Sequence, residues 1–315
     1  MTKVFTKHPQ NPVVKASDMP DDILYVFNPG AIKYKGEYIL MMDACTSALP
    51  IVIWIARSKD GVNFTPDPAP INWPACDPEF PEMCVYDPRI TQIGDEYLIC
   101  YASSGLYGVC IGILKTRDFE KFERVGIASG PGNRNGVLFP EKINGQYVRL
   151  ERPMGDELRD PANIYISYSD DLLHWGNSKR LLQVRPSLWD CQKIGAGAVP
   201  IKTEKGWLEI YHGVWQNCSG FTYKLGVCLL DINDPSKVIA RGEDPVMWPE
   251  HPYEISGNVN NVVFTCNAIV EPDNTVKIYY GAADSCIGLA EAKLDDLIDA
   301  CYSKNRYLKK FFHSH

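Results

Sequence analysis

Short runs in which apolar and polar residues alternate follow one another along most of the chain, separated by turns rich in Gly, Asn and Asp. Two such runs joined by a tight turn are typical of a β-hairpin. Five hairpins are predicted in this way, over residues 28–40, 87–101, 139–150, 197–211 and 266–280. Each is followed by another strand-like run and a second kind of turn, for example Ser58-Lys59-Asp60-Gly61. The chain therefore repeats one ordered unit of strands and turns.

Five four-stranded units at a spacing of roughly 50–70 residues predict an all-β fold, a five-bladed β-propeller. A β-sandwich or a pair of β domains is the alternative, but neither would repeat the same ordered pair of turns five times. No linker rich in Pro or Ser divides the chain, so we expect one domain over residues 1–315. The segment from about 294 to 315 has helical spacing and predicts a short C-terminal helix. Three aromatic residues at the outer ends of blades are expected to pack between neighbouring sheets, namely Phe64, Phe122 and Trp175.

Composition and charge argue against several classes of binding partner. The net charge is −7 and the Lys and Arg residues are scattered, which argues against nucleic acid or an anionic membrane. The 11 cysteines are odd in number and lack zinc spacing, so we expect reduced thiols, a cytoplasmic protein and no metal. No run approaches the ~18–20 apolar residues of a membrane span, and no apolar leader is visible.

Charged and polar residues interrupt the apolar strands at equivalent places in the repeats. In a propeller the first strand of each blade lines the central channel, so the starts of these strands meet at one mouth with the ends of the second strands. The residues predicted at this mouth are Asn28, Asp43, Tyr86, Asp87, Arg134, Asn135, Arg152, Lys193, His212 and Asp284. Singly, each is better explained as a turn, an ion pair, a surface charge or a core histidine. Together they predict a site for a polar, partly anionic ligand.

Several segments resemble glycoside hydrolase family 130, the β-mannoside phosphorylases. The matching segments are 27–30, 86–89, 133–140, 152–153, 193–197, 211–214 and 279–284. The resemblance extends from about residue 11 to about residue 299 and implies a five-bladed propeller. It also implies inverting phosphorolysis, in which phosphate attacks the anomeric carbon of a non-reducing-end β-mannosyl unit. The products are α-D-mannose 1-phosphate and a shortened acceptor, and phosphate is a co-substrate in a reaction without a cofactor.

The same resemblance implies a role for each residue at the mouth. Asp87 matches the general acid, whose proton reaches the glycosidic oxygen through the mannosyl 3-hydroxyl. The positions that match phosphate-binding residues are Arg134, Asn135, Arg152, Lys193 and His212. The positions that match mannosyl-binding residues are Asn28, Asp43, Tyr86 and Asp284. At Asp43 the chain departs from the arginine-containing segment that is usual in the family.

Two other functions stay open at this point. An inverting β-mannosidase would need a second carboxylate to activate water, and Glu141 or Glu151 are the candidates. Phosphate needs no such base, only charge neutralisation and orientation, which a basic cluster supplies. The third hypothesis is a non-catalytic sugar-binding propeller.

The linkage of the substrate and the acceptor sugar are also left open. The substrate linkage is β-1,4 or β-1,2, and the acceptor is mannose or glucose. Loops 103–107, 154–160 and 215–218 are the candidates for acceptor binding. Helical tails of the kind predicted here mediate assembly, so a homo-oligomer is one expectation.

Overall fold

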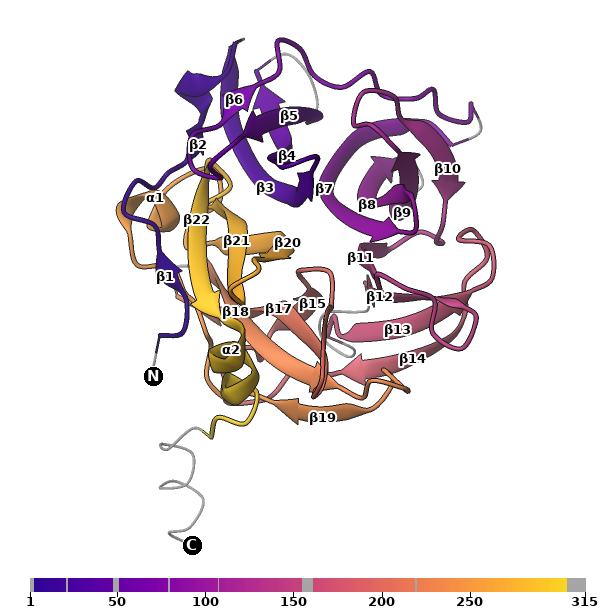
Figure 1. Ribbon diagram of the computed structural model, residues 1–315, viewed down its shortest axis with the longest axis vertical. Coiled ribbons are helices and arrows are strands. Elements are labelled where there is room, and N and C mark those ends of the chain that lie inside the picture. Colours follow the sequence, from indigo (N-terminus) through magenta and orange to yellow (C-terminus); the bar gives the residue numbers. More distant parts are fainter. Residues whose placement is uncertain are drawn as a thin grey trace, which may run out of the picture.

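The described residues form five antiparallel sheets arranged as blades around a central axis (Figure 1). The computed structural model describes residues 3–20, 22–47, 51–78, 80–106, 108–154, 161–218 and 220–304. In the first four blades the strands pair in chain order from the axis outward, and in the fifth the N-terminal strand lies outside the last strands of the chain. The predicted five-bladed propeller is therefore confirmed.

The first three blades each contain four strands. Blade 1 contains β3 (Ile23–Tyr34), β4 (Glu37–Thr46), β5 (Val52–Ser58) and β6 (Thr65–Pro66). Blade 2 contains β7 (Glu82–Ile93), β8 (Glu96–Gly105), β9 (Gly108–Thr116) and β10 (Glu123–Ile127). Blade 3 contains β11 (Asn133–Leu138), β12 (Tyr147–Pro153), β13 (Ile164–Ser169) and β14 (Gly176–Leu182).

The last two blades depart from this plan. In blade 4 the inner strand is interrupted, so that the blade contains β15 (Lys193–Ala196), β16 (Ile201–Thr203), β17 (Gly206–Asn217), β18 (Gly220–Leu230) and β19 (Val238–Arg241). Blade 5 contains β20 (Val263–Val270), β21 (Thr275–Ala282) and β22 (Cys286–Lys293), with β1 (Thr6–Lys7) and β2 (Val14–Lys15) paired to β22. The helices in the described residues are η1 (Ala16–Asp18), α1 (Pro252–Ile255) and α2 (Leu294–Ala300).

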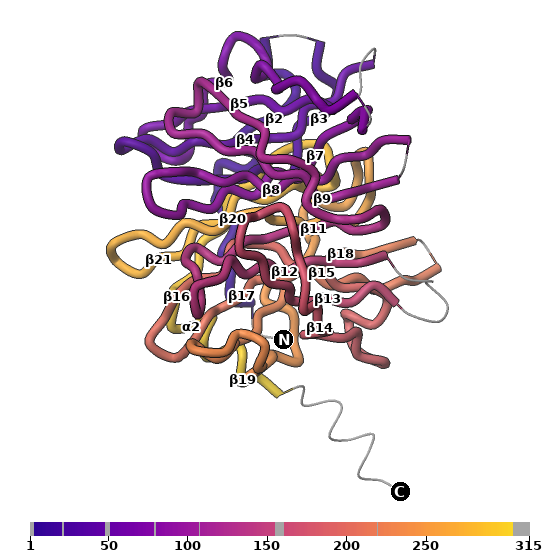
Figure 2. Tube along the Cα trace, turned by 90° about the vertical axis from the view of Figure 1, so that its right-hand side faces the viewer, coloured from indigo at the N-terminus to yellow at the C-terminus, as the bar shows by residue number. Residues whose placement is uncertain are grey.

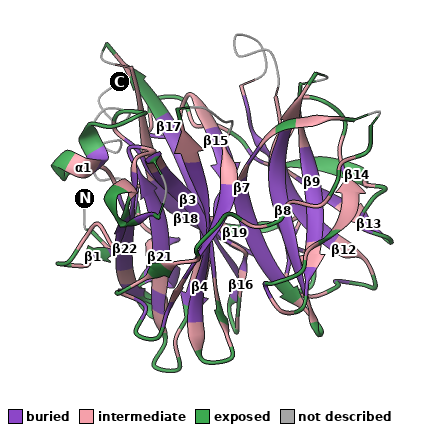
Figure 3. Ribbon diagram, turned by 90° about the horizontal axis from the view of Figure 1, so that it is seen from above, coloured by how far each residue is buried: buried purple, intermediate pink, exposed green. Residues whose placement is uncertain are grey.

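A separate apolar cluster fills each interface between neighbouring blades. Ile39 and Ile99, for example, belong to the cluster between blades 1 and 2, while Trp54 and Tyr279 belong to that between blades 5 and 1. Figure 3 shows the result, with buried strands at the centre and exposed loops at both ends. The Phe64 ring packs edge-on against Tyr279 with centroids 5.4 Å apart, so it lies between blades as expected.

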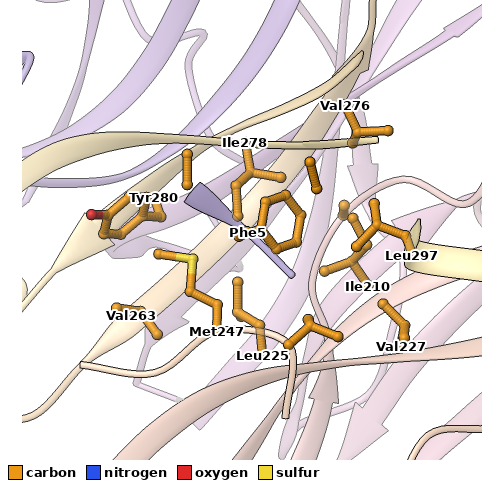
Figure 4. Close-up of a cluster of buried hydrophobic side chains, with 14 of the residues drawn as sticks. Phe5, Ile210, Leu225, Val227, Met247, Val263, Val276, Ile278, Tyr280 and Leu297 are labelled. Atoms are coloured by element: carbon orange, nitrogen blue, oxygen red, sulfur yellow. The ribbon is translucent and has the colours of Figure 1, made fainter. Parts of the chain in front are cut away.

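The N-terminal segment completes the last blade and so closes the ring. Thr6 pairs with Glu291 and Lys7 with Ala290, which makes β1 the outermost strand of blade 5. Phe5 is fully buried in the cluster between blades 4 and 5 and lies beside Ile278 and Leu225 (Figure 4). A strand of two residues carries no periodic pattern, so the sequence did not predict this closure.

The described part of the C-terminal segment contains a short helix, as predicted. Helix α2 begins at Leu294, as expected, and ends at Ala300. Its buried residues Leu297 and Ile298 join the cluster between blades 4 and 5. The rest of the predicted tail, from residue 305 onward, lies outside the described residues.

A buried ion pair holds the N-terminal strand on blade 5. Lys7 Nζ lies 2.6 Å from Glu254 Oε2 and donates to the Trp248 carbonyl at 2.8 Å. Glu254 also accepts hydrogen bonds from the Tyr280 hydroxyl and from two backbone amides of its own loop. Removing one partner of a buried pair is costly, because the other charge stays buried and unpaired.

We therefore expect Lys7→Met to lower the free energy of unfolding by about 3 kcal/mol, measured by urea denaturation. Lys3→Met is the matched control, because Lys3 pairs with Glu250 at the surface and its side chain is 38% exposed. The control should cost less than about 1 kcal/mol. Equal effects for the two variants would contradict a closing role for Lys7.

Candidate active site

A bulge recurs near the start of the inner strands of blades 1, 2 and 3. The pairing register shifts between Phe27 and Gly30, between Tyr86 and Arg89, and between Arg134 and Val137. Within these bulges lie Asn28, Asp87 and Asn135, with φ of 44°, 56° and 55°. A bulge turns a side chain away from the direction that the ladder would give it. Three consecutive blades thus present a polar side chain at the same level of the channel.

The antiparallel hairpins bring the ends of the second strands to the same face as these bulges. Figure 2 shows the strands running from one face to the other, with their connecting turns at the two ends. Arg134 on β11 is directly opposite Arg152 on β12, and Gly195 on β15 is opposite His212 on β17. Arg134, Arg152 and His212 therefore lie on paired inner and second strands of blades 3 and 4.

Asp87 is held at three points by residues of the described chain. Its Oδ1 accepts a hydrogen bond of 2.8 Å from Asn28 Nδ2. Its backbone N–H donates to both carboxyl oxygens of Asp43, at 3.0 and 3.1 Å. Its carbonyl accepts from Arg89 Nη1 at 2.9 Å. Within the described residues no hydrogen bond reaches Oδ2, so this oxygen is free to act on a ligand.

Most of the predicted residues line one cavity of about 340 Å³, a volume within the usual range of small-molecule sites. From the predicted set, the wall contains Asn28, Tyr86, Asp87, Arg134, Asn135, Arg152, His212 and Asp284. Asp43 and Lys193 are not among the described residues that form the wall. Asp43 is fully buried against the backbone of Asp87. The Lys193 ammonium lies 4.7 Å from the ring centre of Phe221 and 5.4 Å from that of Tyr223, which is part of the wall.

The charges around this cavity are separated by blade. The basic half consists of Arg134, Arg152, Lys193 and His212, which come from blades 3 and 4. The acidic half consists of Asp43, Asp87 and Asp284, from blades 1, 2 and 5. Among the described residues no carboxylate lies within ion-pair distance of Arg134, Arg152 or Lys193. The basic half therefore keeps its charge available for an anion.

His212 belongs to the basic half as a neutral ring. Burial, followed by the charge of Arg152, lowers the pKa of His212 well below its ordinary value. Arg152 Nη1 lies 2.9 Å from His212 Nε2, and because an arginine can only donate, Nε2 is the acceptor and Nδ1 carries the proton. Burial and the nearby Arg134 charge lower the pKa of Arg152 to about 9.

Several buried polar atoms of this half have no partner within the described chain. They are Arg134 Nε, Arg152 Nε, Asn135 Oδ1 and His212 Nδ1. A buried polar group without a hydrogen bond destabilises the fold unless a ligand or water supplies one. The three unpaired nitrogen donors are suited to the oxygens of a bound anion.

Two glycines leave room for these contacts. A Cβ on Gly195 would come within 2.5 Å of the His212 ring and 2.9 Å of Arg152 Nη1. A Cβ on Gly281 would come within 2.1 Å of Asn28 Oδ1. Close approach of backbone to side chain at these points accounts for glycine in the segments 193–197 and 279–284.

Two carboxyl groups of the acidic half, those of Asp284 and Asp43, resist ionisation. Burial, followed by the neighbouring Asp87 carboxylate, raises the pKa of Asp284 to about 7. The same two causes raise the pKa of Asp43 well above its ordinary value. Burial also raises the pKa of Tyr86 on the cavity wall. Desolvation beside a like charge thus favours the protonated form of Asp284 and Asp43.

The two glutamates considered as a hydrolytic base lie elsewhere. Glu141 pairs with Lys202 at 2.7 Å, and its side chain is 46% exposed. Glu151 is buried in blade 3, where it accepts from Arg149 Nη2 at 2.5 Å and from Asn133 Nδ2 at 3.1 Å. Neither residue lines the cavity.

Sequence reasoning missed several residues of the site. Arg89 was quoted only as part of a motif, yet it is buried and also donates from Nε to the Gly197 carbonyl across the channel, at 3.1 Å. Phe264 lies under both the Arg89 guanidinium and the His212 ring, with centroid distances of 5.7 and 4.6 Å. A charged residue directly after Asp87-Pro88 could have identified Arg89 as part of the site. The sequence around Phe264 carries no comparable signal.

Among the described residues, no group of three or more His, Cys, Asp or Glu side chains could hold a metal ion. No helix in this part of the chain has the length and apolar character needed to cross a membrane.

Comparison with known proteins gives one consistent result. A family model described as beta-1,4-mannooligosaccharide phosphorylase matches residues 4–303. The chain is 33% identical to the β-1,4-mannooligosaccharide phosphorylase of Ruminococcus albus, over 94% of this chain and 90% of that protein. It is 39% identical to a 1,2-β-oligomannan phosphorylase of a Thermoanaerobacter species, over 86% of this chain and 91% of that protein.

A solved structure supports the same likeness. The β-1,2-mannobiose phosphorylase of Listeria innocua, in complex with β-1,2-mannobiose, superposes with a TM-score of 0.86 at 31% identity. The match covers 94% of this chain and 99% of that one.

The raised pKa of Asp284 leads to a prediction about stability. In the unfolded chain an aspartate ionises near pH 3.9, but in the folded chain it ionises near 7. Between these values the folded state binds more protons, so this group lowers stability as pH rises from about 4 to 7. We expect Asp284→Asn to raise the free energy of unfolding by on the order of 2 kcal/mol at pH 8, and much less at pH 4. Urea denaturation at both pH values measures this, and an equal effect at both would contradict it.

Proposed function

The chain belongs to glycoside hydrolase family 130 and is a glycoside phosphorylase, and from this we propose that it cleaves β-1,2-linked manno-oligosaccharides with inversion. The non-reducing mannosyl unit is transferred to inorganic phosphate, which gives α-D-mannose 1-phosphate. The observation that carries the proposal is the separation of charge in one cavity, with Asp87 facing a basic half that lacks carboxylate partners among the described residues.

Phosphate is the nucleophile in this mechanism and binds to the basic half. Arginine guanidinium groups bind phosphate oxygens in pairs, and Arg134 and Arg152 are paired across β11 and β12. The neutral His212 adds a donor at Nδ1 without adding a charge. Because phosphate is already an anion, the site needs no base, only neutralisation and orientation of the attacking oxygen.

Asp87 is the proton donor on the opposite side of the sugar. A phosphate oxygen forms a bond to the anomeric carbon while the glycosidic bond breaks, and the electron pair of that bond goes to the leaving oxygen. The leaving oxygen takes a proton that originates from Asp87 and passes through the mannosyl 3-hydroxyl. Asn28 binds Oδ1 of Asp87 and so directs the remaining oxygen toward the sugar.

The positions of the two glutamates favour phosphate over water as the nucleophile. An inverting hydrolase needs a carboxylate base on the face opposite the acid. Arg134 and Arg152 line the cavity together with Asp87, while Glu141 and Glu151 are engaged in ion pairs outside it. A non-catalytic sugar-binding role would leave the buried, unpaired basic half unexplained.

The β-1,2 linkage rests on the relatives. The protein with 39% identity over most of both chains is named for 1,2-β-oligomannan, whereas the one with 33% identity is named for β-1,4-mannooligosaccharides. Of the loops considered for the acceptor, residues 107 and 155–160 lie outside the described chain.

A cytoplasmic location is part of the proposal. All 11 cysteines are free, including the buried Cys100, Cys228 and Cys266. Free thiols in this number suit a reducing compartment.

The test of the function is an assay of mannose 1-phosphate. With phosphate present we expect the wild-type protein to release it from β-1,2-mannobiose faster than from β-1,4-mannobiose. Because phosphate is the nucleophile, no cleavage should occur when phosphate is omitted. Phosphorus and proton NMR identify the product and its α configuration. Release of free mannose at the same rate without phosphate would contradict the proposal.

Substitutions in the two halves should have separable effects. We expect Asp87→Asn to lower kcat by about 10²–10⁴-fold with little change in the KM for phosphate, because only the proton is lost. We expect Arg134→Leu to raise the KM for phosphate by about 10–100-fold, because it removes a charge-assisted hydrogen bond. Steady-state kinetics with phosphate varied measures both. A larger effect of Asp87→Asn on the KM for phosphate than on kcat would reverse the assignment.

A further inference from the structure

We propose that Asp43 is a positioning residue for the general acid, holding the backbone of Asp87 so that its carboxyl group faces the bound sugar. The inference rests on the proposed role of Asp87. It replaces direct mannosyl binding as the function of this position, where the chain carries a carboxylate in place of the arginine-containing segment usual in the family.

The backbone at Asp87 requires support. Its φ of 56° lies in the left-handed region, which a residue with a side chain adopts at a cost. It also lies in the bulge between the pairs Tyr86–Ala102 and Arg89–Cys100, where the regular ladder to β8 is interrupted. The N–H of Asp87 points instead to Asp43, whose Oδ1 and Oδ2 accept it at 3.0 and 3.1 Å.

Asp43 is placed to act on Asp87 and not on a ligand. The residue is 0% exposed and is not part of the cavity wall. It lies on β4, where it pairs with Phe27 and Ile53 inside blade 1. Within the described residues, the hydrogen bonds of its side chain are those to the Asp87 N–H.

Blade 1 thereby holds both the backbone and the side chain of a residue on blade 2. Asn28 donates to the Asp87 carboxyl, Asp43 accepts from its N–H, and Arg89 donates to its carbonyl. The N–H and the carbonyl of Asp87 belong to the two peptide planes on either side of its Cα, so the second and third contacts hold one plane each. The direction of the unbonded Oδ2 is therefore fixed before substrate binds, as preorganisation of a proton donor requires.

Two variants of Asp43 test whether its hydrogen bond from the Asp87 N–H is what catalysis requires. Asp43→Leu keeps an approximate volume but removes the acceptor, so the Asp87 peptide loses its anchor. We expect kcat on β-1,2-mannobiose to fall about 10²-fold, the effect of a misplaced catalytic group, with the KM for phosphate changed less than about twofold. Asp43→Asn keeps a carbonyl oxygen that can accept the N–H, and should retain activity within about tenfold of the wild type.

A substrate with an activated leaving group distinguishes positioning from general damage. The aglycone of 2,4-dinitrophenyl β-mannoside departs without protonation, so Asp87→Asn and Asp43→Leu should both cleave it at close to the wild-type rate when phosphate is present. Thr265→Val is a matched control, because it removes a buried hydroxyl that bonds the Asn267 and Tyr279 carbonyls and does not contact Asp87. It should leave kcat on mannobiose unchanged.

The outcomes are separable. Three results would contradict positioning by this hydrogen bond while leaving the proposed function intact. Asp43→Leu could be equally slow on both substrates, or it could match the wild type on mannobiose. Alternatively, Asp43→Asn could be as impaired as Asp43→Leu. If the wild-type protein yields no mannose 1-phosphate from any β-mannobiose, the proposed function fails and this inference falls with it.

Discussion

The hydrogen-bonded, left-handed bulge at Asp87 is the feature on which the rest of the site depends. In a regular strand, side chains alternate between the two faces of the sheet. That alternation would not direct the Asp87 side chain toward the cavity. The bulge costs conformational energy, and the structure offsets that cost with contacts from Asn28, Asp43 and Arg89. Because Asn28 and Asp43 belong to blade 1, the geometry of the proposed acid on blade 2 depends on how two blades pack.

The separation of charge follows from the same architecture. Side chains at equivalent positions of different blades meet at the central axis. Because some blades carry basic residues there and others carry acidic ones, the two sides of the cavity differ in charge. Blades 3 and 4 provide Arg134, Arg152 and His212, and blades 5 and 2 provide Asp284 and Asp87. Burial of like charges lowers the pKa of His212 and raises that of Asp284. The basic half and the acidic half each lower the stability of the folded state. Sites that are preorganised for function commonly reduce stability in this way.

The sequence predicted what is local and periodic. Hairpin alternation and turn chemistry predicted the five blades, and polar residues within apolar strands, such as Arg152 and His212, were the signal for side chains that line one cavity. Closure by β1 was missed because two residues cannot show a period, and only the pairing of Thr6 with Glu291 reveals it. The place of Asp43 behind Asp87 was also missed, since a hydrogen bond between blades leaves no trace in either strand.

In the proposed mechanism a phosphate ion attacks the anomeric carbon from the face opposite to the Asp87 carboxyl. A crystal structure of the Asp87→Asn variant with phosphate and β-1,2-mannobiose is the sharpest test of this arrangement. We expect phosphate oxygens within hydrogen-bond distance of the Arg134 and Arg152 guanidinium groups, with the anomeric carbon between the phosphate and residue 87. Phosphate bound outside the basic half, or on the same face of the sugar as residue 87, would contradict it.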